Sequence, residues 1–490
     1  MTPLSVLTAI AAYFALLFLV SHVAGRKSDN EGFFVGNRKS SWFVVAFAMI
    51  GSSISGVTFV SVPGMVQTSG FSYLQMVLGF VAGQVIIACV LVPLFYRMNL
   101  VSIYGYLENR FGMSSHKTGA WFFFISKMLG ASVRLYLVCL TLQLLVFGPL
   151  RWPFSVNAAC TVALVWLYTF RSGVKSLVWT DSLKTFCLVV SVVLCISHIV
   201  SGMNFGPGGA FSAVVESDLS RMFFLDDAND KRFFFKQFFA GIFTVIAMTG
   251  LDQDMMQRNL SCRSPKDSQK NMITSAVAQF FINLLFLVLG VLLYLYAAER
   301  HIALPEKSDE LFPMIATGGY FPAAVGILFI VGLVSSAYAA AGSALTALTT
   351  SFTIDILGAG NKSGADVRKI RRRVHAGMAV VMGIVIYAFG RLNSTSVIDA
   401  VYTLASYTCG PILGMFAFGL FMKRQVRDKS VPFAAVASPA VCYILQSNSE
   451  KWFDGYSFGY ELLIFNALFT FIGMWIFSGK PSPDDKILHL

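Results

Sequence analysis

Long runs of apolar residues, separated by short charged segments, recur along the whole chain of 490 residues. A run of about 20 apolar residues is long enough to cross the hydrocarbon core of a bilayer as an α-helix. The pattern therefore predicts an all-α polytopic membrane protein. We place about 13 transmembrane helices, at residues 3–24, 41–66, 74–96, 119–148, 153–170, 174–201, 233–256, 271–298, 321–357, 372–390, 397–422, 431–447 and 459–478.

The second predicted span is interrupted by the sequence SSISG at residues 52–56. Non-helical backbone at bilayer depth is tolerated where it is buried in protein or lines a cavity, and transporters use such breaks to bind ions and solutes. Close packing of small residues is the alternative explanation. A second glycine-interrupted stretch follows five spans later, at 239–261. Paired breaks at corresponding positions indicate a transporter built from an inverted repeat.

Composition agrees with a membrane protein, because 56% of residues are hydrophobic, 13% are charged, and the mean hydropathy is +0.68. The net charge of +12 does not indicate nucleic-acid binding. Most Lys and Arg residues lie in loops that an outside N-terminus places in the cytoplasm, which is the bias that orients membrane proteins. We predict a plasma (bacterial inner) membrane protein with its C-terminus inside. The basic KIRRR motif at 369–373 also suits contact with anionic lipid headgroups.

Soluble catalysis finds no support in the sequence, since it contains no P-loop, GxSxG, HExxH or kinase signature. The eight cysteines show no CxxC spacing, so no disulfide framework or zinc site is expected. We expect that the protein is not an enzyme and that it binds no organic cofactor. A transporter-like sensor and a membrane enzyme are the alternatives to a secondary transporter.

Several stretches together resemble the sodium/solute symporter family, including its bacterial sodium-coupled sialic acid and sugar transporters. They occur in the family's order: EGFFVGNRKSSWF, ISGVTFVSVPGM, VSIYGYLENRFG, SGVKSLVWTDSLK, LDQDMMQRNLS, LTTSFTIDIL and TCGPILGMFAFGLFMKR. The resemblance implies a LeuT-like fold that works by alternating access, in a protein that functions as a monomer. It implies an extra helix and basic loop at 1–40, inverted five-helix repeats at 41–201 and 233–422, an external loop at 202–232, and two helices at 423–490.

The same resemblance implies a sodium site, in which carbonyls of the first broken helix map to Gly51 and Ile54. The family's usual hydroxyl pair falls on Ala339 and Ala340, which have no oxygen to offer. Ser336 and Ser343 lie roughly one turn to either side, so a small shift of register could bring a hydroxyl into place. The site is otherwise weak or absent.

Asp181, in the TD motif, resembles the family's carboxylate that handles the coupling ion. Lys184 follows at i+3 on the same helical face, where relatives carry glutamine. Two hypotheses follow. The Lys184 ammonium replaces the bound cation, which would give a sodium-independent or proton-coupled carrier, or it pairs with Asp181 while sodium still binds.

The family's solute pocket maps to Ser55, Thr58, Gln279 and Tyr402, each of which could instead form an interhelical hydrogen bond. Arg134 lies near the position where sialic acid carriers hold a carboxylate, and a bidentate arginine suits that group. The alternative role of Arg134 is a structural ion pair with an acidic side chain such as Asp399. Lys127 and Lys236 are expected to snorkel.

The sequence therefore predicts a secondary active transporter that imports a small organic solute, with sodium as the coupling ion. The sequence is compatible with a sialic acid, a sugar acid or a monocarboxylate as the solute. The alternative is a sodium-independent carrier of a neutral sugar.

Overall fold

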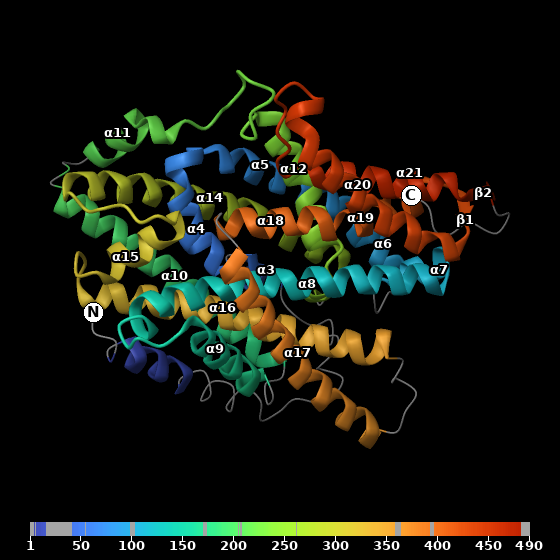
Figure 1. Ribbon diagram of the computed structural model, residues 1–490, viewed down its shortest axis with the longest axis horizontal. Helices are drawn as coiled ribbons and strands as arrows, with labels where there is room; N and C mark the ends of the chain where they lie inside the picture. The colour runs from blue at the N-terminus through green and yellow to red at the C-terminus, as the bar shows by residue number, and fades with distance from the viewer. Residues whose placement is uncertain are drawn as a thin grey trace.

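The computed structural model of the chain describes residues 4, 6–15, 42–53, 55–98, 103–169, 174–203, 205, 208–260, 262–357, 364–392 and 396–481. Figure 1 shows long helices running side by side, with α11 and α15 near one end and the strands β1 and β2 at the other. We call these the outer and inner ends, after the orientation that the sequence predicts.

A short apolar helix at Val6–Ala15 precedes the other helices of the first half of the chain. Ser55 begins α4 because its hydroxyl accepts a hydrogen bond from the Thr58 amide. Short 3₁₀-helical and π-helical segments are labelled η. The elements are α3 (Trp42–Ser53), α4 (Gly56–Ser69), α5 (Ser72–Ile86), η2 (Ile87–Leu91), α6 (Val92–Arg97), α7 (Gly105–Arg110), α8 (Met113–Leu142), η3 (Gln143–Phe147), α9 (Phe154–Thr169) and α10 (Val174–Gly202).

The second half begins after a loop that contains α11 (Gly209–Glu216) and η4 (Asp218–Ser220). Ser264 starts the longest helix, which has Pro265 at its first position and therefore loses no hydrogen bond to the proline. The elements are α12 (Phe234–Val245), η5 (Ile246–Gly250), α13 (Gln253–Asn259), α14 (Pro265–Glu299), η6 (Ser308–Glu310), α15 (Leu311–Thr317), α16 (Ala323–Ser351), η7 (Phe352–Ile356), α17 (Gly364–Leu392), α18 (Val397–Thr408) and α19 (Gly410–Phe421).

The C-terminal elements are β1 (Arg424–Val426), η9 (Asp428–Ser430), α20 (Val431–Trp452), α21 (Leu462–Ile476) and β2 (Ser478–Pro481). The two strands pair antiparallel and close the inner end of α21 against the end of α19.

Six of the described helices are long and apolar enough to cross a bilayer, or up to eight if each of two bent pairs is one span. Shorter apolar helices, at Val6–Ala15, Phe154–Leu167, Leu188–Gly202, Phe234–Gly250 and Leu462–Ile476, occupy the positions of the remaining predicted spans. The chain is a multi-pass helical membrane protein, and the number thirteen stays a prediction.

The predicted break in the second span is confirmed, since α3 and α4 meet at a bend of 52°. The stretch at 239–261 also breaks, because η5 ends at Gly250 and α13 starts at Gln253. A further bend of 46° separates α18 from α19, within the segment 397–422 for which the sequence predicted one span. Pro411 and Gly410, at the start of α19, interrupt the helix there.

Candidate functional site

The bend between α3 and α4 lies where the sequence predicts the first ion and solute contacts. Gly51 is buried in the last turn of α3, where carbonyl groups lack partners within the helix. The Ser55 and Thr58 hydroxyl oxygens lie 3.4 Å apart at the start of α4. Ile54 lies outside the described residues. The break thus collects main-chain and hydroxyl oxygens at one place.

Ser336, on α16, faces this break. A Cβ added to Gly56 would lie 3.8 Å from the Ser336 hydroxyl oxygen, and Ser336 is fully buried. Ser343 lies about two turns further along α16, and its hydroxyl donates to the Ala340 carbonyl at 3.2 Å. The side chain of Ala339 lies outside the described residues. Of the two predicted hydroxyls, Ser336 is therefore the one placed against the broken helix.

Asp181 and Lys184 lie on α10, but their side chains are outside the described part of the structure. The helix itself packs against both α3 and α16. Its backbone therefore borders the same region as Gly51 and Ser336.

Tyr402, on α18, joins a cluster of aromatic side chains. Its hydroxyl lies 2.8 Å from the Tyr73 hydroxyl, and its ring lies 5.2 Å from that of Tyr460 and 6.2 Å from that of Phe80, centroid to centroid. Aromatic rings with hydroxyl groups offer apolar faces and hydrogen bonds in one place. We call Tyr73, Phe80, Tyr402 and Tyr460 the aromatic cluster.

Arg134 lies in the C-terminal half of α8, which packs against α4, α16 and α18, and its side chain is partly buried. Among the side chains that the structure describes, no ion pair within 4.0 Å includes Arg134. The described side chains show no ion pair within 4.0 Å between Arg134 and Asp399, and the Asp399 carboxylate accepts a hydrogen bond from the Tyr460 hydroxyl. The Arg134 charge is therefore not neutralised by that acid.

Gln279, on α14, accepts a hydrogen bond of 3.0 Å from the side-chain amide of Gln84, on α5. Its main-chain carbonyl accepts a second, of 2.7 Å, from Asn283. The side chain therefore forms an interhelical hydrogen bond here, which is the alternative that the sequence left open.

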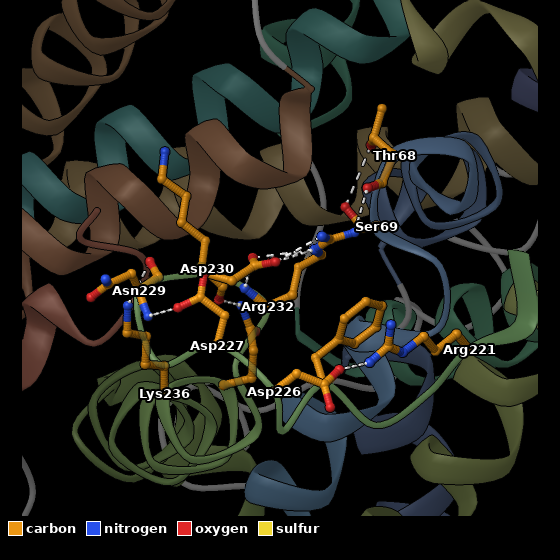
Figure 2. Close-up of polar contacts among 12 residues, drawn as sticks. Thr68, Ser69, Arg221, Asp226, Asp227, Asn229, Asp230, Arg232 and Lys236 are labelled. Carbon is orange, nitrogen blue, oxygen red and sulfur yellow. Dashed lines mark hydrogen bonds and ion pairs between the residues drawn. The ribbon is translucent and has the colours of Figure 1, made fainter. Parts of the chain in front are cut away.

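A cavity of about 550 Å³ lies at the outer end. Tyr73, Asp399 and Tyr460 line it, so it leads to the aromatic cluster. Its wall includes the loop in Figure 2, where the Arg232 guanidinium donates three hydrogen bonds to the Asp230 carboxylate, the shortest of 2.7 Å. This pairing holds the pKa of the Asp230 carboxyl below its usual range. The Asp230–Arg232 ion pair therefore lies at the rim of the cavity.

Lys127 does not snorkel, which corrects the prediction from the sequence. Its ammonium lies 2.8 Å from Asp252 and 3.8 Å from Asp254, and the latter carboxylate also lies 3.3 Å from Arg258. The Lys127 and Asp252 side chains are each 14% exposed. These four residues balance in charge, since two cations face two carboxylates. Lys236, in contrast, reaches the Asn229 carbonyl of the outer loop at 3.1 Å.

Tyr73, Tyr460 and Asp252 are not among the site residues that the sequence predicted. The sequence does contain a signal for Asp252, because an acid inside an apolar stretch needs a cation. Lys127 is an intramembrane cation, so the two residues could have been expected to pair. No comparable signal marks the two tyrosines, which come from segments far apart in the chain.

Comparison with known proteins agrees with this arrangement. The family model for the sodium:solute symporter family matches residues 33–428. The sodium/sialic acid symporter NanT of Aliivibrio fischeri is 25% identical over 91% of this chain and 89% of its own. The symporter SiaT of Proteus mirabilis is 23% identical over 88% and 87%. The human sodium/iodide cotransporter is 25% identical over 84% of this chain, which spans only 65% of that protein.

Solved structures show the same fold. A Na⁺-coupled sialic acid symporter, in a substrate-bound outward-open state, superposes with a TM-score of 0.78 at 19% identity, over 96% of this chain and 97% of the other. Mhp1, a transporter of the nucleobase-cation-symport-1 family, superposes with a TM-score of 0.57 at 14% identity, over 90% and 93%. These neighbours share the LeuT-like arrangement that the sequence predicted. The family match, over most of the chain, shows that this protein is a transporter and belongs to the sodium:solute symporter family.

Proposed function

We propose that this protein imports a small organic anion bearing a carboxylate, such as a sialic acid or another sugar acid, together with sodium. Arg134 carries this proposal. An arginine at the centre of a transmembrane helix costs about 2.5–3.5 kcal/mol on insertion scales, so it needs a partner or a purpose. The nearest charged cluster, Lys127, Asp252, Asp254 and Arg258, balances among its own members, and Asp252 acts on Arg134 only from a distance. Among the described side chains no ion pair within 4.0 Å includes Arg134, so its guanidinium is open to an incoming anion.

The surroundings of Arg134 suit a polar solute with an apolar face. Tyr402 lies on α18, which packs on the helix of Arg134, and the aromatic cluster offers ring faces and hydroxyl groups. Ser55 and Thr58 add hydroxyls at the start of α4. The outer cavity of about 550 Å³ is large enough to admit a monosaccharide on its way to the cluster.

Sodium is the expected driving ion of the family, and the oxygen atoms at the break fit a hard cation. Gly51 and Ile54 would offer carbonyls, and Ser336 a buried hydroxyl directed at the break. Ser343 would need a change of rotamer, because its hydroxyl donates to Ala340. Asp181 on α10 would add a carboxylate. Bound sodium would supply a positive charge whose entry down its gradient drives the solute.

We further propose the orientation and layout that the sequence predicts, with an outside N-terminus, inverted repeats at 41–201 and 233–422, and a functional monomer in the bacterial inner membrane. Alternation then exposes the aromatic cluster first to the outer cavity and afterwards to the inner end. The Lys127 ion pairs lie on the inner side of Arg134, seven residues earlier on α8, where they would close the path in the outward-facing state.

The test is uptake into proteoliposomes of labelled N-acetylneuraminate, gluconate, lactate and glucose, with an inward sodium gradient. Each acid is compared with its neutral methyl ester. A hydrogen bond to a charged group contributes about 1.5–3 kcal/mol, so wild type should prefer the acid by about 10- to 150-fold. Arg134→Gln should abolish this preference, and Arg134→Lys should keep part of it.

Equal loss of acid and ester uptake in Arg134→Gln would contradict the assigned role, as would acid uptake that survives unchanged. Sodium dependence is tested separately by replacing sodium with choline at clamped pH. Uptake that persists in choline and is lost in Lys184→Gln would favour the carrier in which Lys184 replaces the cation. This sodium-independent carrier remains the second candidate because Ala339 and Ala340 replace the hydroxyl pair of the family's sodium site.

A further inference from the structure

An apolar groove of about 520 Å³ runs between α9 and α17. Ala158, Val162 and Trp166 line it from α9, and Ala376, Gly383 and Tyr387 line it from α17. The two helices lie against each other at the edge of the bundle (Figure 1). Nearby Val380 and Ile384 are each 62% exposed, so the groove opens toward the surroundings of the protein, which in a membrane are lipid.

The length of the groove matches one leaflet of a bilayer. From Ala376 to Tyr387 the helix advances about 16 Å, at 1.5 Å per residue. This is roughly half of the ~30 Å hydrocarbon core. The groove therefore has room along its length for an acyl chain that enters from one side of the membrane.

One end of the groove is basic. With about 3.6 residues per turn, Lys369, Arg372 and Arg373 lie on the same face of α17 as Ala376 and Gly383. All three cationic side chains are exposed. Trp166 lies at this end, because Thr169, one turn later on α9, lies 3.0 Å from the His375 ring. The face that forms the groove thus continues directly into a cluster of three positive charges.

Arg371 shows that this placement is specific to one face. It lies about 160° around the helix from Arg373, and its charge acts on His375, which is buried against Thr169 and Thr349. At the other end of the groove, Arg391 donates to the Tyr387 hydroxyl at 3.2 Å and lies over its ring. As far as the structure describes the two ends, the end with Lys369 is the one that presents several exposed cations to a headgroup.

We propose that this groove and its basic end form a binding site for an anionic phospholipid. One acyl chain occupies the groove, and the phosphate headgroup lies against Lys369, Arg372 and Arg373. Charge complementarity favours this occupant over a second copy of the chain, whose own exposed face would bring three further cations to the same end. The proposal is independent of the transported solute. Under the orientation proposed above, the lipid belongs to the cytoplasmic leaflet.

Trp166 provides a direct readout, because bromine atoms on an acyl chain quench tryptophan fluorescence on contact. Purified full-length protein is titrated in mixed micelles with dibrominated phosphatidylglycerol or dibrominated phosphatidylcholine. The contribution of Trp166 is the difference between wild type and Trp166→Phe. We expect phosphatidylglycerol to quench it at about tenfold lower mole fraction, since each nearby cation adds attraction to an anionic headgroup.

Paired variants separate charge from shape. Arg373→Gln should reduce the preference for phosphatidylglycerol, whereas Arg371→Gln, two residues away on the opposite face, should leave it unchanged. Gly383→Leu should weaken quenching by both lipids, because a side chain at 383 points at Val162, 3.9 Å from the added Cβ. Glycerol phosphate added without acyl chains tests the headgroup alone and should compete only weakly.

If a variant fails to fold, the wild type still tests the charge. Raising sodium chloride from 0.1 to 1 M shortens the Debye length from about 10 to about 3 Å, so the preference for phosphatidylglycerol should shrink. Equal quenching by the two lipids at low salt would overturn the proposal. Protection of Trp166 from both lipids in a particle with the mass of a dimer would also overturn it, in favour of an interface between two copies.

Discussion

Replacing Lys127 by Met should destabilise the protein strongly, because it leaves Asp252 without its cation. The Lys127 ammonium lies 2.8 Å from the Asp252 carboxylate, and both side chains are 14% exposed. Methionine has nearly the same length as the lysine stem, so packing is retained while the charge is lost. Asp254 loses its longer contact with Lys127, of 3.8 Å, but keeps Arg258 at 3.3 Å, so the loss falls mainly on Asp252.

The magnitude follows from the burial of the pair. Removing one partner of a buried ion pair costs about 3–5 kcal/mol. The other Asp252 oxygen still accepts hydrogen bonds from the Asp254 and Met255 amides, which places the expected cost near the lower value. We expect a loss of about 3 kcal/mol.

The measurement is the free energy of unfolding in mixed micelles, from the fluorescence of the tryptophans during a titration with sodium dodecyl sulfate. Lys117→Met is the matched control, since Lys117 is an exposed lysine on the same helix, and it should stay within about 0.5 kcal/mol of wild type. Lys127→Met combined with Asp252→Asn should recover most of the loss, because it removes both charges and keeps the acceptor for the amides of α13.

Two results would refute this reasoning. A Lys127→Met variant as stable as the control would mean that water or another group already compensates Asp252. Additive losses in the double variant would mean that the two side chains do not interact.

Two further predictions concern the packing of the helices and the outer loop. A Cβ on Gly79 would lie 2.2 Å from the Phe238 carbonyl oxygen, whereas one on Gly130 would meet nothing within 4 Å. Gly79→Ala should therefore cost about 1–3 kcal/mol of unfolding free energy or prevent folding, and an equally stable variant would disprove the close contact between α5 and α12. Arg232 holds the pKa of Asp230 below its usual range, so the pair stabilises the folded state above the unfolded pKa of about 3.9 and this contribution is lost as pH falls through the lower folded pKa. The stability difference between wild type and Arg232→Gln should shrink below about pH 4 in denaturant titrations, and a difference that is constant from pH 6 to 3 would exclude this linkage.

The sequence predicted much of the fold because the bilayer imposes its own rules. Backbone groups must be satisfied within each span, so apolar runs of the right length become helices whatever their neighbours are. The break at SSISG was predictable for the same reason, since an interruption inside a membrane helix needs a local compensation. Ser55 provides part of it by accepting from the Thr58 amide.

The site was predicted less completely. Residues of the broken helix follow from local sequence. The family pattern places the hydroxyl pair on Ala339 and Ala340, whereas the structure brings Ser336 against Gly56. Gln279 instead bonds Gln84, and Asp399 bonds Tyr460 rather than Arg134. Hydrogen-bond partners 61 to 195 residues apart are chosen by how the helices pack, and the periodicity of a single helix does not contain that information.

By itself the sequence therefore determined the helices, the first break and the presence of intramembrane charges. Their pairing was decided only by the tertiary structure. Lys127 and Arg134 lie two turns apart on one helix and look alike in the sequence. Packing against the start of α13 gives Lys127 two carboxylates within 4.0 Å, while Arg134 interacts electrostatically with Tyr402, on α18, and at longer range with Asp252. A charge in a low-dielectric interior is defined by its neighbours within a few ångströms, and those neighbours come from other helices.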